Sequence, residues 1–205
     1  MTRIGGLEAD DPRIEMYLDL LLRWNTKVNL VSRRAEREKI RGELVAPLLR
    51  AVKIAGPLEG QLVDVGAGSG MGGVLFGLAN EALRVSFVER VRKKAVFIKE
   101  ACRALGLDMR TRVLDRDWES CTWAGMEVAY LYLRAVGGSA GIVRGMTPAM
   151  SSGSRVFLLE REEEERPSGW QVENAAAVGA GLFLRILRRE TPPQAQAGTA
   201  FHVEH

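Results

Sequence analysis

The chain has 205 residues, of which 46% are hydrophobic, and its formal net charge is +3. This length suits one domain with an added segment, and the apolar content is ample for a core. No apolar stretch is long enough to cross a membrane, and residues 1–6 lack the order of a secretion signal, so we expect a cytoplasmic protein.

A helical segment is predicted before the first strand. Apolar side chains repeat with helical spacing over residues 8–28, and Pro12 suits the start of a helix. A second helix is predicted over residues 36–55, although Gly42 and Pro47 interrupt its pattern. We expect residues 1–57 to pack as this helical segment on a second unit formed by residues 58–205.

From residue 61 onward, predicted strands and helices alternate. The strands are expected at 61–65, 84–88, 111–114, 127–132 and 154–159, and the helices at 72–80, 91–105 and 138–150. The last part of the chain predicts a β-hairpin from residues 170–178 and 182–189, with a candidate final strand at 201–205. The pattern indicates the α/β class, with a mostly parallel seven-stranded sheet and helices on both faces.

The most informative segment is residues 61–70, Gln-Leu-Val-Asp-Val-Gly-Ala-Gly-Ser-Gly. An apolar strand ends near Asp64, and Gly66, Gly68 and Gly70 remove Cβ where the backbone must turn and approach a ligand. The N–H groups of the following helix face the same crevice. Together these features predict a nucleotide-cofactor pocket, with a tight structural turn as the alternative.

The loop also satisfies G-x-G-x-x-G over residues 68–73, a pattern typical of dinucleotide sites. S-adenosylmethionine is favoured because Asp64 precedes the first glycine by two residues, a helical segment precedes the loop, and a hairpin closes the chain. Glu89, at the end of the second strand, is expected to accept the ribose hydroxyls of either cofactor. The alternatives are a helix or turn cap for Asp64 and a surface ion pair with Arg90 or Arg92 for Glu89.

Basic residues gather in four stretches, which are 33–41, 90–94, 110–116 and 185–189. Several basic clusters on a small domain favour a polyanionic partner such as nucleic acid. The alternative is a mixed solvated surface, because residues 162–165 form an acidic run. The two cysteines are predicted to be reduced thiols, and we expect no metal site from the cysteines and histidines.

Two segments carry a family resemblance. Residues 23–30, Arg-Trp-Asn-Thr-Lys-Val-Asn-Leu, resemble the W-N-x-x-x-N-L signature of the GidB/RsmG proteins, bacterial methyltransferases of guanine N7 in small-subunit ribosomal RNA. Residues 64–71 are similar to that family's cofactor loop, and residues 133–136, Leu-Arg-Ala-Val, lie where the family has S-R-A. The resemblance covers most of residues 14–160. It implies a Rossmann-like methyltransferase that uses S-adenosylmethionine on ribosomal RNA or the small ribosomal subunit.

The resemblance also implies site residues. The expected cofactor-binding residues are Asp64, Gly66, Gly68, Gly70, Met71, Glu89, Asp117, Trp118 and Arg134. The pair Asp117-Trp118 lies where the family contacts the adenine. Guanine N7 has an accessible lone pair, so no general base is expected. Arg134 is the catalytic candidate, with the role of positioning a phosphate or the guanine edge. Its alternative role is that of a surface charge at the end of a strand. Trp24 or Trp118 could stack on a ring, although a buried helix anchor is the favoured interpretation of Trp24.

The chain departs from the family pattern at four places. R-H-x-x-D-S becomes Arg-Gly-Glu-Leu-Val-Ala at residues 41–46, and the usual proline of the loop is replaced in Gly72-Gly73. A lysine after the fifth strand is replaced by Glu160, and a C-terminal R-H is echoed only by residues 201–202. Three alternatives therefore stay open: a methyltransferase for a small molecule or protein, a ribosome-associated cofactor-binding protein without turnover, and a dinucleotide oxidoreductase.

Overall fold

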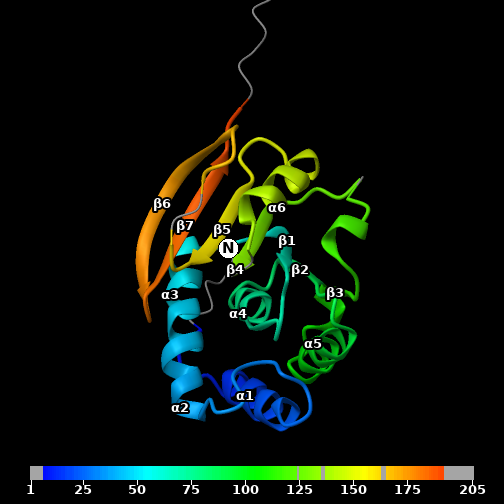
Figure 1. Ribbon diagram of the computed structural model, residues 1–205, viewed down its shortest axis with the longest axis vertical. Helices are drawn as coiled ribbons and strands as arrows, with labels where there is room; N and C mark the ends of the chain where they lie inside the picture. Colours follow the sequence, from blue (N-terminus) through cyan, green and yellow to red (C-terminus); the bar gives the residue numbers. More distant parts are fainter. Residues whose placement is uncertain (1–6, 124, 135–136, 163–164, 192–205) are drawn as a thin grey trace, which may run out of the picture.

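The computed structural model describes residues 7–123, 125–134, 137–162 and 165–191. Its centre is a seven-stranded sheet with helices on both faces (Figure 1). The strand order is β3-β2-β1-β4-β5-β7-β6, in which β1 to β5 are parallel, β7 runs antiparallel to β5, and β6 pairs antiparallel with β7 in the terminal hairpin. The predicted class, the mostly parallel sheet and the terminal hairpin are confirmed. The candidate strand at 201–205 lies outside the described residues.

The elements follow the predicted order closely. They are α1 (Pro12–Asn25), α2 (Arg37–Ile40), the π-helix η1 (Arg41–Val45), α3 (Ala46–Ala55), β1 (Gly60–Val65), α4 (Met71–Ala79), β2 (Leu83–Val88), α5 (Arg92–Ala104), the 3₁₀ turn η2 (Asp108–Arg110), β3 (Thr111–Leu114), the 3₁₀ turn η3 (Trp118–Ser120), β4 (Tyr130–Arg134), α6 (Ser139–Met146), the 3₁₀ turn η4 (Thr147–Ala149), β5 (Arg155–Glu160), β6 (Trp170–Gly179) and β7 (Leu182–Arg189). Among the strands, β4 begins at Tyr130 rather than at 127, and α1 and α6 are shorter than predicted.

Two apolar layers cover the sheet. Helices α1, α3, α4 and α5 share one core cluster with one sheet face, and α6 packs with the other face. Successive strand residues point to opposite faces, so Leu62 belongs to the first layer and Val63 to the second. Asp64 therefore lies on the α4 side of β1. The helical segment shares a core with the sheet, and the division at residue 57 stays a prediction.

The predicted single helix over residues 36–55 is wrong in detail. It consists of α2, the π-helical turn η1 and α3, and Pro47 lies in the first turn of α3. Proline has no N–H to donate to the carbonyl four residues earlier, so a regular α-helix cannot run through this point. The wider π-turn absorbs the interruption and brings Glu43 and Leu44 to the wall of a cavity described below.

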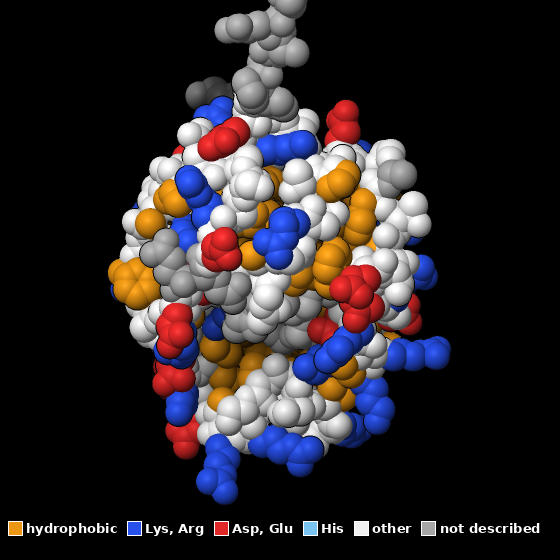
Figure 2. Space-filling view, turned by 45° about the horizontal axis from the view of Figure 1, so that its top comes forward, with side chains coloured by type: hydrophobic (Ala, Val, Ile, Leu, Met, Phe, Trp, Pro, Cys, Tyr) orange, Lys and Arg blue, Asp and Glu red, His pale blue; other side chains and the backbone are white. Residues whose placement is uncertain are grey.

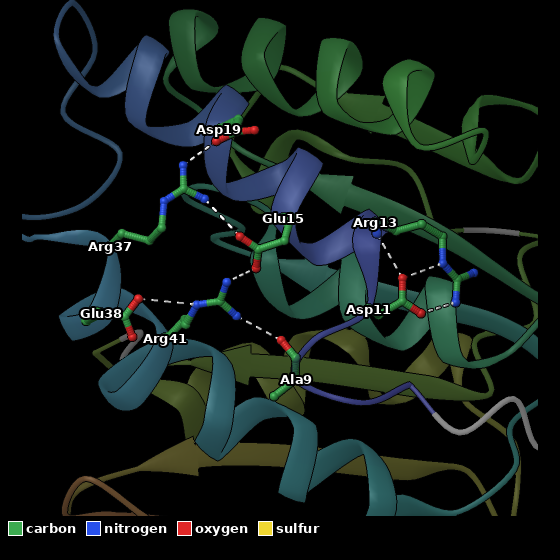
Figure 3. A network of polar contacts seen from close by, with 8 residues as sticks. All are labelled: Ala9, Asp11, Arg13, Glu15, Asp19, Arg37, Glu38 and Arg41. Atoms are coloured by element: carbon green, nitrogen blue, oxygen red, sulfur yellow. Dashed lines mark hydrogen bonds and ion pairs between the residues drawn. The ribbon is translucent and has the colours of Figure 1, made fainter.

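An ion-pair network fixes α1 against this interrupted helix (Figure 3). Arg37 and Arg41 both pair with Glu15 of α1, and Arg37 also pairs with Asp19. Arg41 additionally donates to the carbonyl oxygen of Ala9 at 2.9 Å. These two arginines of the first basic stretch are therefore used within the fold.

The first turn of α4 lies unusually close to the sheet. A Cβ added at Gly72 would be 2.2 Å from Cε1 of Tyr132, and one added at Gly73 would be 2.4 Å from Cε1 of Phe87. Contacts this short require the backbone or a ring to move. The Gly72-Gly73 pair, which replaces the family's proline, is thus matched to the aromatic rings of β4 and β2 beneath it.

We predict that Gly72→Ala lowers the free energy of unfolding by about 1–3 kcal/mol, because overpacking forces strain into a dense core. Chemical denaturation measures this loss. Gly42→Ala is the control, since a Cβ there meets nothing within 4 Å. Combining Gly72→Ala with Tyr132→Leu should cost less than the sum of the two single changes. Strictly additive losses would show that the ring of Tyr132 is not what excludes a side chain at position 72.

Candidate active site

The glycine loop connects β1 to α4 at the carboxyl edge of the sheet. Gly66, Gly68 and Gly70 all have positive φ angles, of 69°, 60° and 71°. An L side chain is strained in this region, which explains the alternating glycines. The hydroxyl of Tyr17 on α1 donates to the carbonyl oxygen of Ser69 at 2.7 Å, so the helical segment supports the loop directly.

Glu89 holds the other side of the loop. Its Oε2 accepts from the N–H of Gly68 at 2.8 Å, and its Oε1 accepts from the N–H of Val91 at 2.8 Å. The residue is buried and forms no ion pair with a described residue, so the alternative of a surface pair with Arg90 or Arg92 is wrong. Each carboxylate oxygen keeps a further lone pair, which leaves acceptor capacity for a ligand.

Asp64 is buried at the end of β1. Its Oδ2 accepts from the N–H of Gly73 at 3.0 Å, so the cap predicted as its alternative role is present in the fold. Burial raises the pKa of Asp64 to about 7, and the Glu89 carboxylate adds to this, whereas the Gly73 N–H and the Arg134 guanidinium oppose it. Asp64 also lines a cavity, so capping does not exclude ligand contact.

A cavity of about 650 Å³ opens beside the loop. Its wall includes Gly66, Gly68, Glu89, Asp117, Trp118 and Arg134. Six of the predicted site residues therefore meet at one cavity. The Trp118 ring packs over Gly145 of α6, where an added Cβ would be 2.5 Å from the ring. This close contact sets where the indole stands at the cavity wall.

A second cavity of about 430 Å³ lies between the loop and residues 30–44 of the helical segment. It is lined by Asp64, Met71, Gly72 and Tyr132 on the sheet side, and it shares Gly66, Gly68 and Arg134 with the first cavity. The side chain of Arg134 forms no hydrogen bond or ion pair with another residue of the described ranges. A free guanidinium therefore stands where the two cavities meet.

The signature at residues 23–30 shapes the rim of the second cavity. Oδ1 of Asn25 accepts from the N–H groups of Leu30 and Val31 at 2.9 and 3.0 Å, which fixes the turn after α1. Trp24 lies away from both cavities, with its ring 5.8 Å from that of Phe97 and its Nε1 donating to a glutamate of α5. The favoured interpretation of Trp24 as a helix anchor agrees with this packing.

Gly70, which was predicted to bind the cofactor, does not reach either cavity. A Cβ there would be 2.9 Å from Ile98, so its place is set by packing. Sequence reasoning missed Tyr17, Tyr132 and Gly145. The pair of glycines at the family's proline position was the one signal that pointed to Tyr132, because it indicates a close neighbour.

Much of the positive charge serves the fold. Arg110 donates to three backbone carbonyls, and Arg185 is buried and paired with Glu160 at 2.8 Å. Exposed cations without a described ion-pair partner remain near the loop and on α5, namely Arg33, Arg34, Arg90, Arg92 and Lys93. Figure 2 shows Lys and Arg side chains gathered over the end of the molecule formed by α1, α2 and α5. This smaller set is what a polyanion would meet.

Across the described ranges, no group of three or more His, Cys, Asp or Glu side chains is arranged to hold a metal ion. No helix in those ranges combines the length and apolar character that a membrane crossing requires.

Comparison with known sequences decides the family. The GidB family, described as rRNA small subunit methyltransferase G, matches residues 10–178. The chain belongs to the GidB family. A ribosomal RNA small subunit methyltransferase G from Stenotrophomonas maltophilia K279a is 35% identical over 173 residues, covering 82% of this chain and 79% of that protein. One from Paracoccus denitrificans is 26% identical over 93% of this chain and 94% of that protein. The resemblance at residues 23–30 and 64–71 is confirmed.

Solved structures agree with this GidB chain in fold. TrmN from Thermus thermophilus superposes with a TM-score of 0.60 at 22% identity, covering 77% of this chain and 53% of that one. An RNA methyltransferase from Salinibacter ruber, solved with S-adenosyl-L-homocysteine, gives a TM-score of 0.58 at 14% identity, covering 72% and 93%. The Rossmann-like methyltransferase fold is therefore confirmed, and with the family it establishes S-adenosylmethionine as the cofactor.

Asp64→Asn should change how stability depends on pH. The raised pKa means that the folded chain keeps a proton which the unfolded chain loses between about pH 4 and pH 7. Wild-type stability therefore falls as pH rises through this window. Asparagine keeps an acceptor for Gly73, so the variant should be more stable than wild type by about 1–3 kcal/mol at pH 8 and equal to it near pH 4. Urea unfolding across this range measures the difference in stability between the variant and wild type. A difference that stays constant with pH would show that the raised pKa of Asp64 is not its cause.

Gly145→Ala should displace the Trp118 ring and weaken binding of S-adenosylhomocysteine about tenfold, the scale of one lost aromatic contact. Calorimetric titration measures the affinity. Gly42→Ala is the control, since Gly42 does not line the first cavity and its Cβ would meet nothing within 4 Å. Equal affinities for the two variants would remove Trp118 from the cofactor site.

Proposed function

We propose that this GidB protein methylates guanine N7 in small-subunit ribosomal RNA, with the nucleoside part of the cofactor in the first cavity, its amino-acid end directed toward Asp64, and the target base entering through the second cavity. The observation that carries this placement is the meeting of the two cavities at the glycine loop and Arg134. Family membership and the relatives' names support the ribosomal RNA substrate. The cations left exposed near the loop suit an RNA backbone.

The residues present fit the cofactor. Glu89 is placed for ribose hydroxyls, Asp117 and Trp118 lie across the first cavity for the adenine, and Asp64 offers a buried carboxylate at the second cavity. When bound, S-adenosylmethionine supplies a methyl group on an electrophilic sulfonium. Two carboxylates near a positively charged cofactor also give charge complementarity, which a dinucleotide with its pyrophosphate would lack here.

Positioning is the main task of the protein in this reaction. Guanine N7 needs no deprotonation, so the chain must hold the base in line and exclude competing orientations. Arg134 is placed to bind the guanine edge or a phosphate at the junction of the cavities. Glu43, which lines the second cavity, is available to offset the positive charge that the base gains.

Tritium transfer from S-adenosylmethionine to small ribosomal subunits and to stripped ribosomal RNA tests the proposal, followed by mass spectrometry of the nucleosides for 7-methylguanosine. Label in 7-methylguanosine is the expected result, and the two substrates separate naked RNA from the assembled particle. Measured cofactor binding with no label in RNA would overturn the proposal. Label in protein or small molecules would favour those substrates instead.

Arg134→Ala should lower kcat/KM for RNA about a hundredfold, the scale of a misplaced reactant, and change S-adenosylhomocysteine affinity less than threefold. Arg112→Ala is the control, because Arg112 is an exposed arginine outside both cavities. Steady-state kinetics and calorimetry give the two numbers. The opposite ranking, with affinity lost and transfer kept, would place Arg134 on the cofactor alone.

A further inference from the structure

Tyr132 lies beside Asp64 under the first turn of α4. The two residues are direct neighbours on the parallel strands β4 and β1, so their side chains share the α4 face of the sheet. The Tyr132 ring is 5.5 Å from that of Phe76, and the residue is 2% exposed. It lines the second cavity together with Asp64, Met71 and Gly72.

The Tyr132 hydroxyl is buried and has no hydrogen-bond partner within the described parts of the chain. A buried hydroxyl without a partner costs free energy, and native proteins seldom keep one unless a water or a ligand completes it. Burial raises the pKa of Tyr132, so the group stays protonated and acts as a donor at any physiological pH. A phenylalanine would fill the same space without this cost.

Other polar groups converge on the same place. The N–H groups of Met71 and Gly72, the first two of α4, make no hydrogen bond to another described residue. The helix N-terminus adds a partial positive charge, which favours an anion. Asp64 supplies an acceptor for a cation on the opposite side. The Tyr132 hydroxyl and the two N–H groups are donors for an anion, and Asp64 is an acceptor for a cation. This combination matches a zwitterion such as an amino acid better than it matches a neutral guanine ring.

We propose that the Tyr132 hydroxyl positions the amino-acid end of the cofactor by donating a hydrogen bond to its carboxylate, while Asp64 faces its ammonium group. This inference rests on the proposed function only for the presence of the cofactor, and it is independent of the RNA substrate. It also explains the matched pair at positions 72 and 132. Glycine at 72 makes room for a tyrosine whose ring, including the Cζ that carries the hydroxyl, lies against the first turn of α4.

The test compares two ligands on Tyr132→Phe by calorimetric titration. S-adenosylhomocysteine carries the amino-acid end, whereas 5′-methylthioadenosine lacks it. We expect S-adenosylhomocysteine to bind about tenfold more weakly to the variant than to wild type, the scale of one hydrogen bond to a charged group. The affinity for 5′-methylthioadenosine should change less than twofold. The melting temperature of the ligand-free variant should equal or exceed that of wild type, because an unsatisfied polar group is removed.

Tyr130→Phe is the matched control, since Tyr130 lies on the same strand but lines neither of the two cavities. Unchanged S-adenosylhomocysteine affinity in Tyr132→Phe, or an equal loss for both ligands, overturns the inference. Wild type that binds neither ligand overturns the cofactor site together with the inference. Selective loss of S-adenosylhomocysteine binding in a protein that methylates no RNA supports the inference and refutes only the proposed substrate.

Discussion

The close approach of α4 to the sheet is the contact on which the site depends. Because Gly72 and Gly73 carry no side chains, the first helical turn rests directly on the rings of β4 and β2. This brings the N–H of Gly73 within hydrogen-bond distance of Asp64, which lies near the carboxyl end of β1. A helix N-terminus, a buried carboxyl group and the glycine loop are thereby held at one point of the sheet edge.

The helical segment before the sheet is part of the same construction. Tyr17 bonds to the glycine loop, and Asn25 fixes the turn that forms the rim of the second cavity. Arg37 and Arg41 tie this segment together through Glu15 (Figure 3). Because Arg37 and Arg41 form ion pairs within the fold, they are not available to bind RNA. The positive charge that a polyanion would meet is therefore smaller than the sequence suggests.

The sequence predicted the sheet, the loop and most of the site because these features depend on local pattern. Alternating strands and helices fix the class, and a parallel sheet brings Asp64, Glu89 and Arg134 to one edge without further information. The remaining features depend on distances between residues far apart in the chain. Two of these features are close contacts, between Gly72 and Tyr132 and between Gly145 and Trp118. A third is the π-turn before Pro47. None can be predicted without the positions of side chains in three dimensions. Glu89 follows β2 as expected, yet its two hydrogen bonds from backbone N–H groups could not be predicted from the sequence.

The hydrogen bond from Tyr17 to the carbonyl of Ser69 joins residues 52 positions apart. Synthesis proceeds from the N-terminus, so this hydroxyl already exists when the glycine loop leaves the ribosome. A chain without α1 would keep every acid and glycine of the cleft but would lose this support for the loop. The information that specifies the cleft therefore includes a residue that lines neither cavity.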